Sequence, residues 1–185
     1  MWRDFAWAAG VREKAMNDKP TSLNADGISE PFSSDSVPWE EWSEGSRYGS
    51  KFRYLSGFGG ANHVGVQLEE LAPGMQSSLN HYHMLEEEQA FILEGEMTLR
   101  LGDKTYPMKA GDHVVFPAGQ KVGHSFYNHS DAPCRFIMIG EKNPNEVVFY
   151  PETGRVGVRL MGEGYDRSAV MEYWQGADTE RKNPK

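Results

Sequence analysis

Residues 95–116 read GEMTLRLGDKTYPMKAGDHVVF and contain the pattern that decides the fold. Met97, Leu99 and Leu101 alternate with polar residues, which is the period of two expected for a strand with one buried face. Gly102-Asp103 and then residues 110–112 follow as turn signals. This stretch therefore predicts short strands joined by tight turns.

The same organisation extends outward over residues 48–150. Residues 64–69 also alternate, and further turn signals stand at residues 73–74, 117–119 and 130–133. Strands repeated about every 8–12 residues are typical of antiparallel sandwiches and barrels. No helical stretch of about 10–15 residues intervenes, as a parallel α/β sheet would require. We therefore predict an all-β protein with a single antiparallel β-barrel of the jelly-roll kind.

Three regions are expected: an N-terminal arm over residues 1–47, the barrel over residues 48–160 and a C-terminal extension over residues 161–185. The arm carries Trp39 and Trp42 among acidic residues, and two exposed tryptophans are costly. They must dock on their own barrel or on a second copy of the chain. We favour the second copy, and hence a homodimer. In the C-terminal part, residues 154–160 predict one more strand and residues 168–174 a short helix.

Composition excludes several classes of function. The chain has 185 residues, with 19 basic against 27 acidic side chains and a net charge of −8, which disfavours nucleic-acid binding. Its longest apolar run, residues 5–9, is far shorter than the roughly 20 residues of a membrane span. Cys134 is the single cysteine, which excludes an internal disulfide and suits a reducing compartment. The N-terminal residues lack the apolar core of an export signal, so we expect a cytoplasmic protein.

Histidine is scarce, yet His81 and His83 stand two residues apart in an expected strand, so both imidazoles face the same side. Paired imidazoles are natural ligands of a transition metal, and His124 with Glu88 could complete a set of four. Glu88 is an odd number of positions from both histidines, so residues 84–87 must contain a turn or bulge. In a regular strand, Glu87 would face the metal instead.

Two sets of residues resemble the two motifs of the cupin family. Gly74, His81-Tyr82-His83, Glu88 and Gly95 resemble the first motif, and Gly111, residues 117–119, His124 and Asn128 resemble the second. The resemblance implies the family's small β-barrel, a double-stranded β-helix, and a divalent transition metal (iron, manganese, zinc or nickel) held by His81, His83, Glu88 and His124. The gap from Glu88 to Gly95 matches the motif, which favours Glu88 over Glu87. Residues 150–159 resemble a subgroup of small bacterial cupins without an assigned activity.

Four residues are candidates for a substrate pocket. Gln120 and Lys121 lie in a loop longer than the motif's, directly before His124, where a cation could meet an anionic substrate. Phe126 and Ile92 share parity with the ligand of their strand and could line an apolar pocket, although barrel packing explains them equally well. Asn128 is expected to be a structural hydrogen-bonding residue, since a carboxamide has no proton to exchange near neutral pH.

An imidazole–carboxylate site with open positions permits three functions for a small-molecule ligand. A Lewis-acid metal would support an isomerase, epimerase or lyase acting on a sugar, a sugar phosphate or an oxo acid. A redox-active metal would support a dioxygenase, and a metal that only holds a ligand would make the protein a sensor. We favour the first, and the sequence assigns no catalytic residue.

Overall fold

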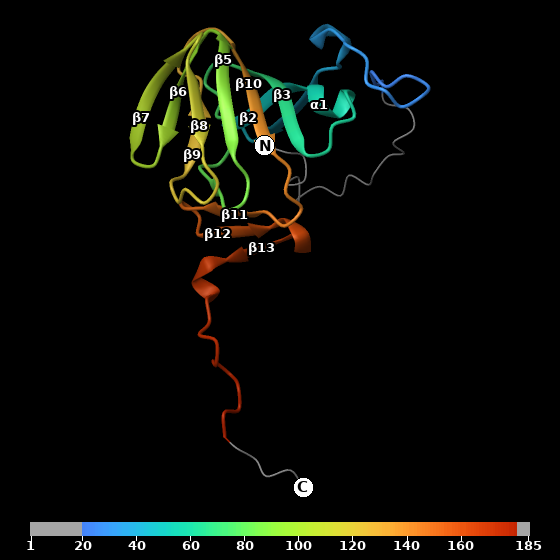
Figure 1. The fold of residues 1–185 in the computed structure, drawn as a ribbon. Helices are drawn as coiled ribbons and strands as arrows, with labels where there is room; N and C mark the ends of the chain where they lie inside the picture. The colour runs from blue at the N-terminus through green and yellow to red at the C-terminus, as the bar shows by residue number, and fades with distance from the viewer. Residues whose placement is uncertain (1–19, 181–185) are drawn as a thin grey trace.

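The computed structural model describes residues 20–180 of the chain and consists mainly of β-strands (Figure 1). The strands are β1 (Glu40–Glu44), β2 (Tyr48–Tyr54), β3 (Val64–Leu71), β4 (Tyr82–His83), β5 (Glu88–Glu94), β6 (Glu96–Leu101), β7 (Lys104–Lys109), β8 (His113–Phe116), β9 (His124–Tyr127), β10 (Cys134–Glu141), β11 (Val147–Tyr150), β12 (Arg155–Val158) and β13 (Glu163–Asp166). The short helix α1 (Leu55–Phe58) and the 3₁₀ turns η3 (Ser34–Ser36), η4 (Arg159–Met161) and η5 (Arg167–Ala169) connect them.

The strands form three antiparallel sheets. A six-stranded sheet with the order β1-β2-β3-β10-β5-β8 faces a three-stranded sheet with the order β7-β6-β9. A four-stranded sheet, β13-β12-β11-β4, lies across one end of this sandwich (Figure 1). The predicted all-β, antiparallel jelly-roll architecture is therefore confirmed, although its hydrogen bonds form three sheets and not one closed barrel.

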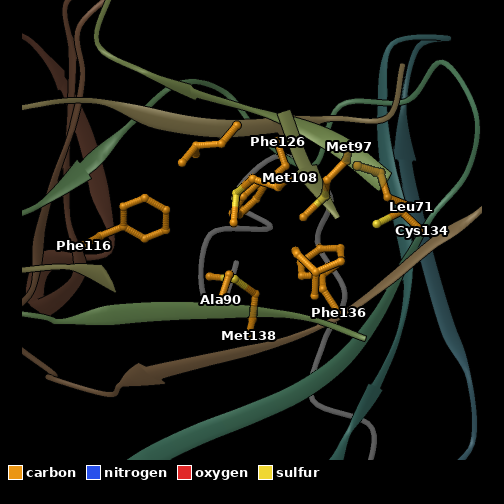
Figure 2. Close-up of a cluster of buried hydrophobic side chains, with 11 residues drawn as sticks. Leu71, Ala90, Met97, Met108, Phe116, Phe126, Cys134, Phe136 and Met138 are labelled. Carbon is orange, nitrogen blue, oxygen red and sulfur yellow. The ribbon is translucent and has the colours of Figure 1, made fainter. Parts of the chain in front are cut away.

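Alternate side chains of the two facing sheets fill the space between them and form the apolar core (Figure 2). Cys134, Phe136 and Met138 share the inner face of β10, as their parity predicts. The other members are Leu71, Ala90, Ile92, Met97, Leu99, Met108, Phe116 and Phe126. Burial raises the pKa of the Cys134 thiol to about 11, so this cysteine is an inert packing residue.

The motif glycine Gly95 makes the tight connection between β5 and β6 possible. Its φ of +78° lies in the left-handed region, and a Cβ atom there would stand 2.9 Å from the carbonyl oxygen of Pro133. Only glycine meets both conditions without strain. The two sheets of the sandwich are joined at this point.

Strand β3 is unusual because its polar residues face inward. Gln67 and Glu69 are buried together with Leu71, whereas Val66 and Leu68 are less buried. Hydrophobicity alone would place the valine and leucine side chains in the interior. The reversal reflects the polar cavity that Glu69 lines, described below.

The two tryptophans of the predicted arm pack on their own chain. Trp42 lies on β1, which pairs with β2, and its indole Nε1 donates a hydrogen bond to Ser50 at 3.0 Å. The guanidinium of Arg53 lies 4.6 Å from the Trp39 ring centroid. Trp42 thus has a partner within its own chain, whereas Trp39 precedes β1 and stays 38% exposed. Packing of this arm on a second copy stays a prediction.

The C-terminal region confirms one element and corrects another. Strand β12 occupies the segment where residues 154–160 predict a strand. The helix expected over residues 168–174 is absent; the segment contains only the turn η5 and irregular backbone. Val170 and Tyr173 are largely exposed there, and a short helix needs packing for its stability. Within residues 20–180, no helix has the length and apolar character needed to cross a bilayer.

Candidate metal centre

Four residues predicted to form a site come together where the end of the sandwich meets the four-stranded sheet. His83 lies on β4, Glu88 begins β5 and His124 begins β9. His81 precedes β4 and forms a β-bridge with His124, through which their backbones exchange hydrogen bonds. The site therefore depends on the meeting of separate sheets.

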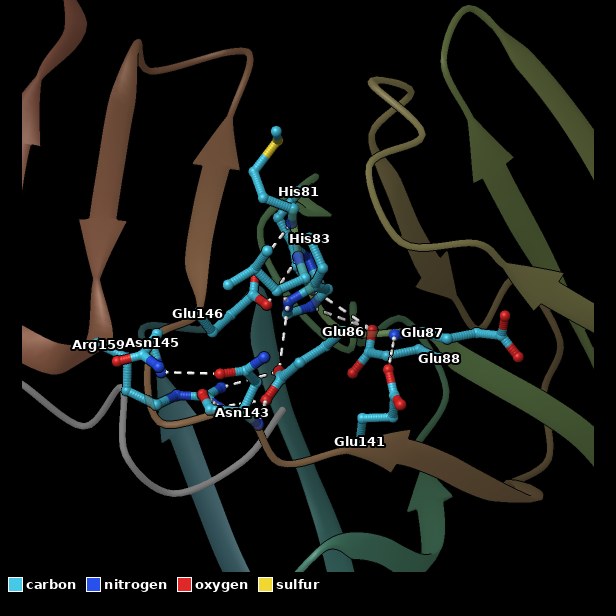
Figure 3. Close-up of polar contacts among 12 residues, drawn as sticks. His81, His83, Glu86, Glu87, Glu88, Glu141, Asn143, Asn145, Glu146 and Arg159 are labelled. Carbon is cyan, nitrogen blue, oxygen red and sulfur yellow. Dashed lines mark hydrogen bonds and ion pairs between the residues drawn. The ribbon is translucent and has the colours of Figure 1, made fainter.

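The turn between β4 and β5 decides which glutamate enters the cluster. Residues 84–87 lie outside any strand, so the alternation restarts at Glu88. The Glu88 side chain is buried among the histidines. Glu87 instead accepts a hydrogen bond from Gln89 on the strand's outer side, while its backbone N–H donates to Glu141 (Figure 3).

The three imidazoles surround one oxygen atom of Glu88. Its Oε2 lies 3.2 Å from Nε2 of His83, 3.2 Å from Nε2 of His124 and 3.9 Å from Nε2 of His81. The ring of Phe116 stacks on His124 with 3.7 Å between centroids and 4° between planes. The core thus fixes the orientation of one imidazole directly.

Burial and mutual charge shift the pKa of every member of the cluster. Burial and the neighbouring imidazoles lower the pKa of His81 well below its usual range, and burial lowers that of His124. Burial also opposes the charged form of His83, but Glu88 and Glu146 outweigh it and raise the His83 pKa to about 9. Burial favours a neutral Glu88, yet His83 and His124 hold its pKa well below the usual range.

The donor set fits a divalent transition metal. Both ring nitrogens of the buried His83 lack a hydrogen-bond partner, which is an unfavourable state for polar atoms away from water. Donor atoms of His81, Glu88 and His124 lie within 4.8 Å of one another, and His83 Nε2 points at the same carboxylate. Imidazole nitrogen and carboxylate oxygen are the donors that zinc, iron and manganese sites use. The cluster could hold such an ion.

A small cavity opens beside the cluster. It is lined by His81, Glu88, His124, Glu69, Ser77, Ser78, Ser125, Phe126, Phe136 and Met138. Of the four predicted pocket residues, Phe126 lines this cavity and Ile92 lies in the apolar core. Gln120 and Lys121 are exposed on the loop before His124 and are not part of the lining. Their contact with a substrate stays a prediction.

Glu69 is the functional candidate that the sequence analysis missed. Its buried carboxylate accepts a hydrogen bond from Ser50 at 3.2 Å, and burial raises its pKa. The available signal was its parity with Leu71, a core residue two positions later on β3. Glutamate is rarely buried without a partner, and this one lines the cavity beside the cluster.

A second group of carboxylates, Glu86 and Glu146, lies on the other side of His83 and was also missed. Oxygens of Glu86 and Glu146 each lie 3.6 Å from Nδ1 of His83, opposite the side that faces Glu88. Both side chains are fully buried, and Figure 3 draws them together with His83. Glu146 is 60 residues from Glu86 in the sequence, so no local pattern links the two carboxylates.

Asn128 has the structural role that was predicted for it. Its amide donates to the carbonyl oxygens of Leu71 at 2.7 Å and Ala132 at 2.8 Å, and its Oδ1 accepts from the backbone N–H of Ser130 at 2.9 Å. These bonds hold the loop between β9 and β10 and lie outside the histidine cluster.

Comparison with known proteins identifies the architecture. The family model described as "Cupin domain" matches residues 67–140, which include the whole cluster. A sugar phosphate isomerase of the cupin superfamily from Silicibacter pomeroyi is 33% identical, with a TM-score of 0.64 over 69% of this chain and 85% of that protein. The chain belongs to the cupin superfamily.

Two further relatives of this cupin are described with different functions. A putative sugar phosphate isomerase from Acidithiobacillus ferrooxidans is 26% identical, with a TM-score of 0.68 over 81% of this chain and 94% of that protein. The polyketide synthase CurC from Streptomyces cyaneus is 30% identical over 79 residues, or 43% of this chain. The match spans about half the length of that curated relative (49%).

Proposed function

We propose that this cupin is a metal-dependent isomerase acting on a small phosphorylated sugar. The observation that carries the proposal is the buried cluster of three histidines and Glu88 beside a cavity that Glu69 lines. The two structural relatives described as sugar phosphate isomerases support the substrate class. The metal, held by His81, His83, Glu88 and His124, would act as a Lewis acid on the substrate's carbonyl oxygen.

Isomerisation moves a proton between two neighbouring carbon atoms, so the cavity needs a group that holds it. Glu69 is the candidate: it takes the proton from the carbon next to the carbonyl, so that the C–H bonding electrons form an enediolate, and it returns that proton to the former carbonyl carbon. The proton of the neighbouring hydroxyl group passes to the former carbonyl oxygen, which leaves the new carbonyl on the carbon that lost its proton. The hydroxyl group of Ser50 orients one carboxylate oxygen of Glu69. Lys121, on the exposed loop, is the proposed contact for the substrate's phosphate.

Deuterium incorporation tests this function. Protein loaded separately with zinc, manganese, nickel or iron is incubated in D₂O with a panel of aldose and ketose phosphates, and the products are followed by NMR. We expect interconversion of one pair, with solvent deuterium at the carbon that receives the proton. Glu69→Gln should abolish the exchange. Glu70→Gln, on the opposite face of the same strand, should not.

Other outcomes would replace the proposal. Uptake of dioxygen by the iron-loaded protein in the presence of an oxo acid would indicate a dioxygenase. A ligand retained without turnover under every metal would indicate a sensor. A homodimer in a cytoplasmic setting belongs to the same proposal, and light scattering that gives a mass near the 20.8 kDa of one chain would refute the dimer.

A further inference from the structure

Residues 146–148 contact His83, one of the four proposed ligands, from the four-stranded sheet. The backbone of His83 pairs with Val148 on β11, in the four-stranded sheet. The other three members of the cluster belong to the sandwich or to the bridge between His81 and His124. Among the four proposed ligands, His83 is therefore the one that lies on the four-stranded sheet.

Glu146, just before β11, holds the turn that follows His83. One of its carboxylate oxygens accepts the backbone N–H of Met84 at 2.8 Å, and the other accepts that of Leu85 at 3.0 Å. Its Oε1 also lies 3.6 Å from His83 Nδ1. That separation exceeds a hydrogen bond, so the effect on the ring is electrostatic.

Glu86 places a second carboxylate at the same ring nitrogen. Its Oε2 lies 3.6 Å from His83 Nδ1. The guanidinium of Arg159 donates to both oxygens of Glu86, with Nη2 3.0 Å from Oε2, and the backbone N–H of Asn143 donates to Oε1 (Figure 3). Arg159 is the last residue of the stretch 150–159, whose sequence resembles a subgroup of small bacterial cupins.

These contacts argue against a second cation site at His83, Glu86 and Glu146. The carboxylate oxygens there already accept hydrogen bonds from backbone N–H groups or from Arg159. A cation would have to displace the guanidinium and compete with these donors. The arrangement instead places negative charge beside one nitrogen of a buried imidazole.

We propose that Glu146, supported by Glu86 and Arg159, is a positioning residue that keeps the proton of His83 on Nδ1 and leaves Nε2 as the metal-binding lone pair. Two carboxylates at Nδ1 favour a proton on that nitrogen, because the N–H dipole then points at negative charge. Outer partners of this kind commonly raise metal affinity 10- to 100-fold. The inference rests on the proposed metal site.

The test compares Glu146→Gln with Glu141→Gln. Glu141 is a matched control because it also accepts a backbone N–H of this turn, that of Glu87 at 3.0 Å, whereas no hydrogen bond or ion pair joins it to His83 within residues 20–180. Zinc affinity is measured by competition with a chelator. Glu146→Gln should weaken it 10- to 100-fold, and Glu141→Gln should leave it within about twofold of the wild-type value.

The tautomer supplies a readout that loss of fold would not mimic. Nitrogen NMR of the zinc-loaded wild type should show His83 protonated at Nδ1, and Glu146→Gln should shift or broaden this signal. Because Glu146→Gln also removes a backbone acceptor, Glu86→Gln serves as a second variant that leaves the N–H groups of Met84 and Leu85 satisfied. Glu86→Gln should also lower the zinc affinity.

The outcomes separate the two proposals. Wild-type protein that binds zinc, with Glu146→Gln and Glu86→Gln binding it as tightly, overturns the positioning role alone. Equal losses in Glu146→Gln and Glu141→Gln also overturn it, because the effect would then come from the turn. Wild-type protein that binds no zinc overturns the metal site and the positioning role together.

Discussion

Two ends of the same interior differ completely in chemistry although the same strands build them. On β5, Glu88 lies in the histidine cluster, while Ala90, two residues later, lies in the apolar core. On β9, His124 and Phe126 repeat this change. Alternation therefore determines which side chains face inward, but not whether a given inward position is apolar or ionisable.

The two ends also differ in what holds them together. The apolar end depends on close packing, in which the size and shape of a hydrophobic side chain matter and no specific partner is needed. The polar end depends on matched charges, in which each buried group needs a particular partner. Substitutions at the first end should therefore change stability, and substitutions at the second should change metal binding or the response to pH.

The largest effect is expected from Phe136→Ala at the apolar end. Phe136 is fully buried, and deleting its ring should lower the free energy of unfolding by about 3–5 kcal/mol. Urea unfolding measures it. Phe91→Ala, on the neighbouring strand but 40% exposed, is the control and should cost markedly less. Equal losses of unfolding free energy in the two variants would mean that Phe136 does not lie in the core.

The next largest effect is expected from Asn128→Ala, which should lower the free energy of unfolding by about 2–3 kcal/mol. The substitution leaves the buried carbonyl group of Leu71 without its amide donor and removes one of the two side-chain donors to the carbonyl of Ala132. Zinc affinity should stay unchanged, because Asn128 does not contact the cluster. A loss of zinc without a loss of stability would assign Asn128 to the polar end and contradict its structural role.

The sequence predicts the apolar end better than the polar end for a physical reason. Parity alone places Cys134, Phe136 and Met138 together, because burial acts on each strand separately. The cluster could be predicted only because glycine-framed motifs surround His81, His83, Glu88 and His124. Glu69 carries only a weak local signal, its parity with Leu71, and Glu146 carries none.

The metal-free protein should lose stability as the pH rises from about 6.5 to about 9. The His83 pKa of about 9 lies above its ordinary value of 6.5, so the charged form stabilises the fold. This contribution is complete below pH 6.5 and disappears through pH 9, a change on the order of 2 kcal/mol. Thermal unfolding across this range measures it. His83→Gln should remove the slope, and a slope that persists would assign the effect to another group.

The smallest effect is expected from Lys121→Ala, and it should appear in KM. An exposed lysine contributes at most about 1 kcal/mol to an ionic contact, which is about fivefold in KM for a phosphorylated substrate. The kcat and the metal content should not change. An unchanged KM would leave Lys121 as a solvated loop residue, and loss of metal would show that the loop supports the ligand shell.

The polar interior end of this cupin is proposed to bind a divalent metal through His81, His83, Glu88 and His124. Zinc titration of the wild type, His124→Ala and His113→Ala tests it most directly, since His113 is exposed on β8 outside the cluster. We expect one zinc ion per chain, an affinity loss of about a hundredfold or more in His124→Ala, and none in His113→Ala. Equal affinities in all three proteins, or no binding by the wild type, would contradict it.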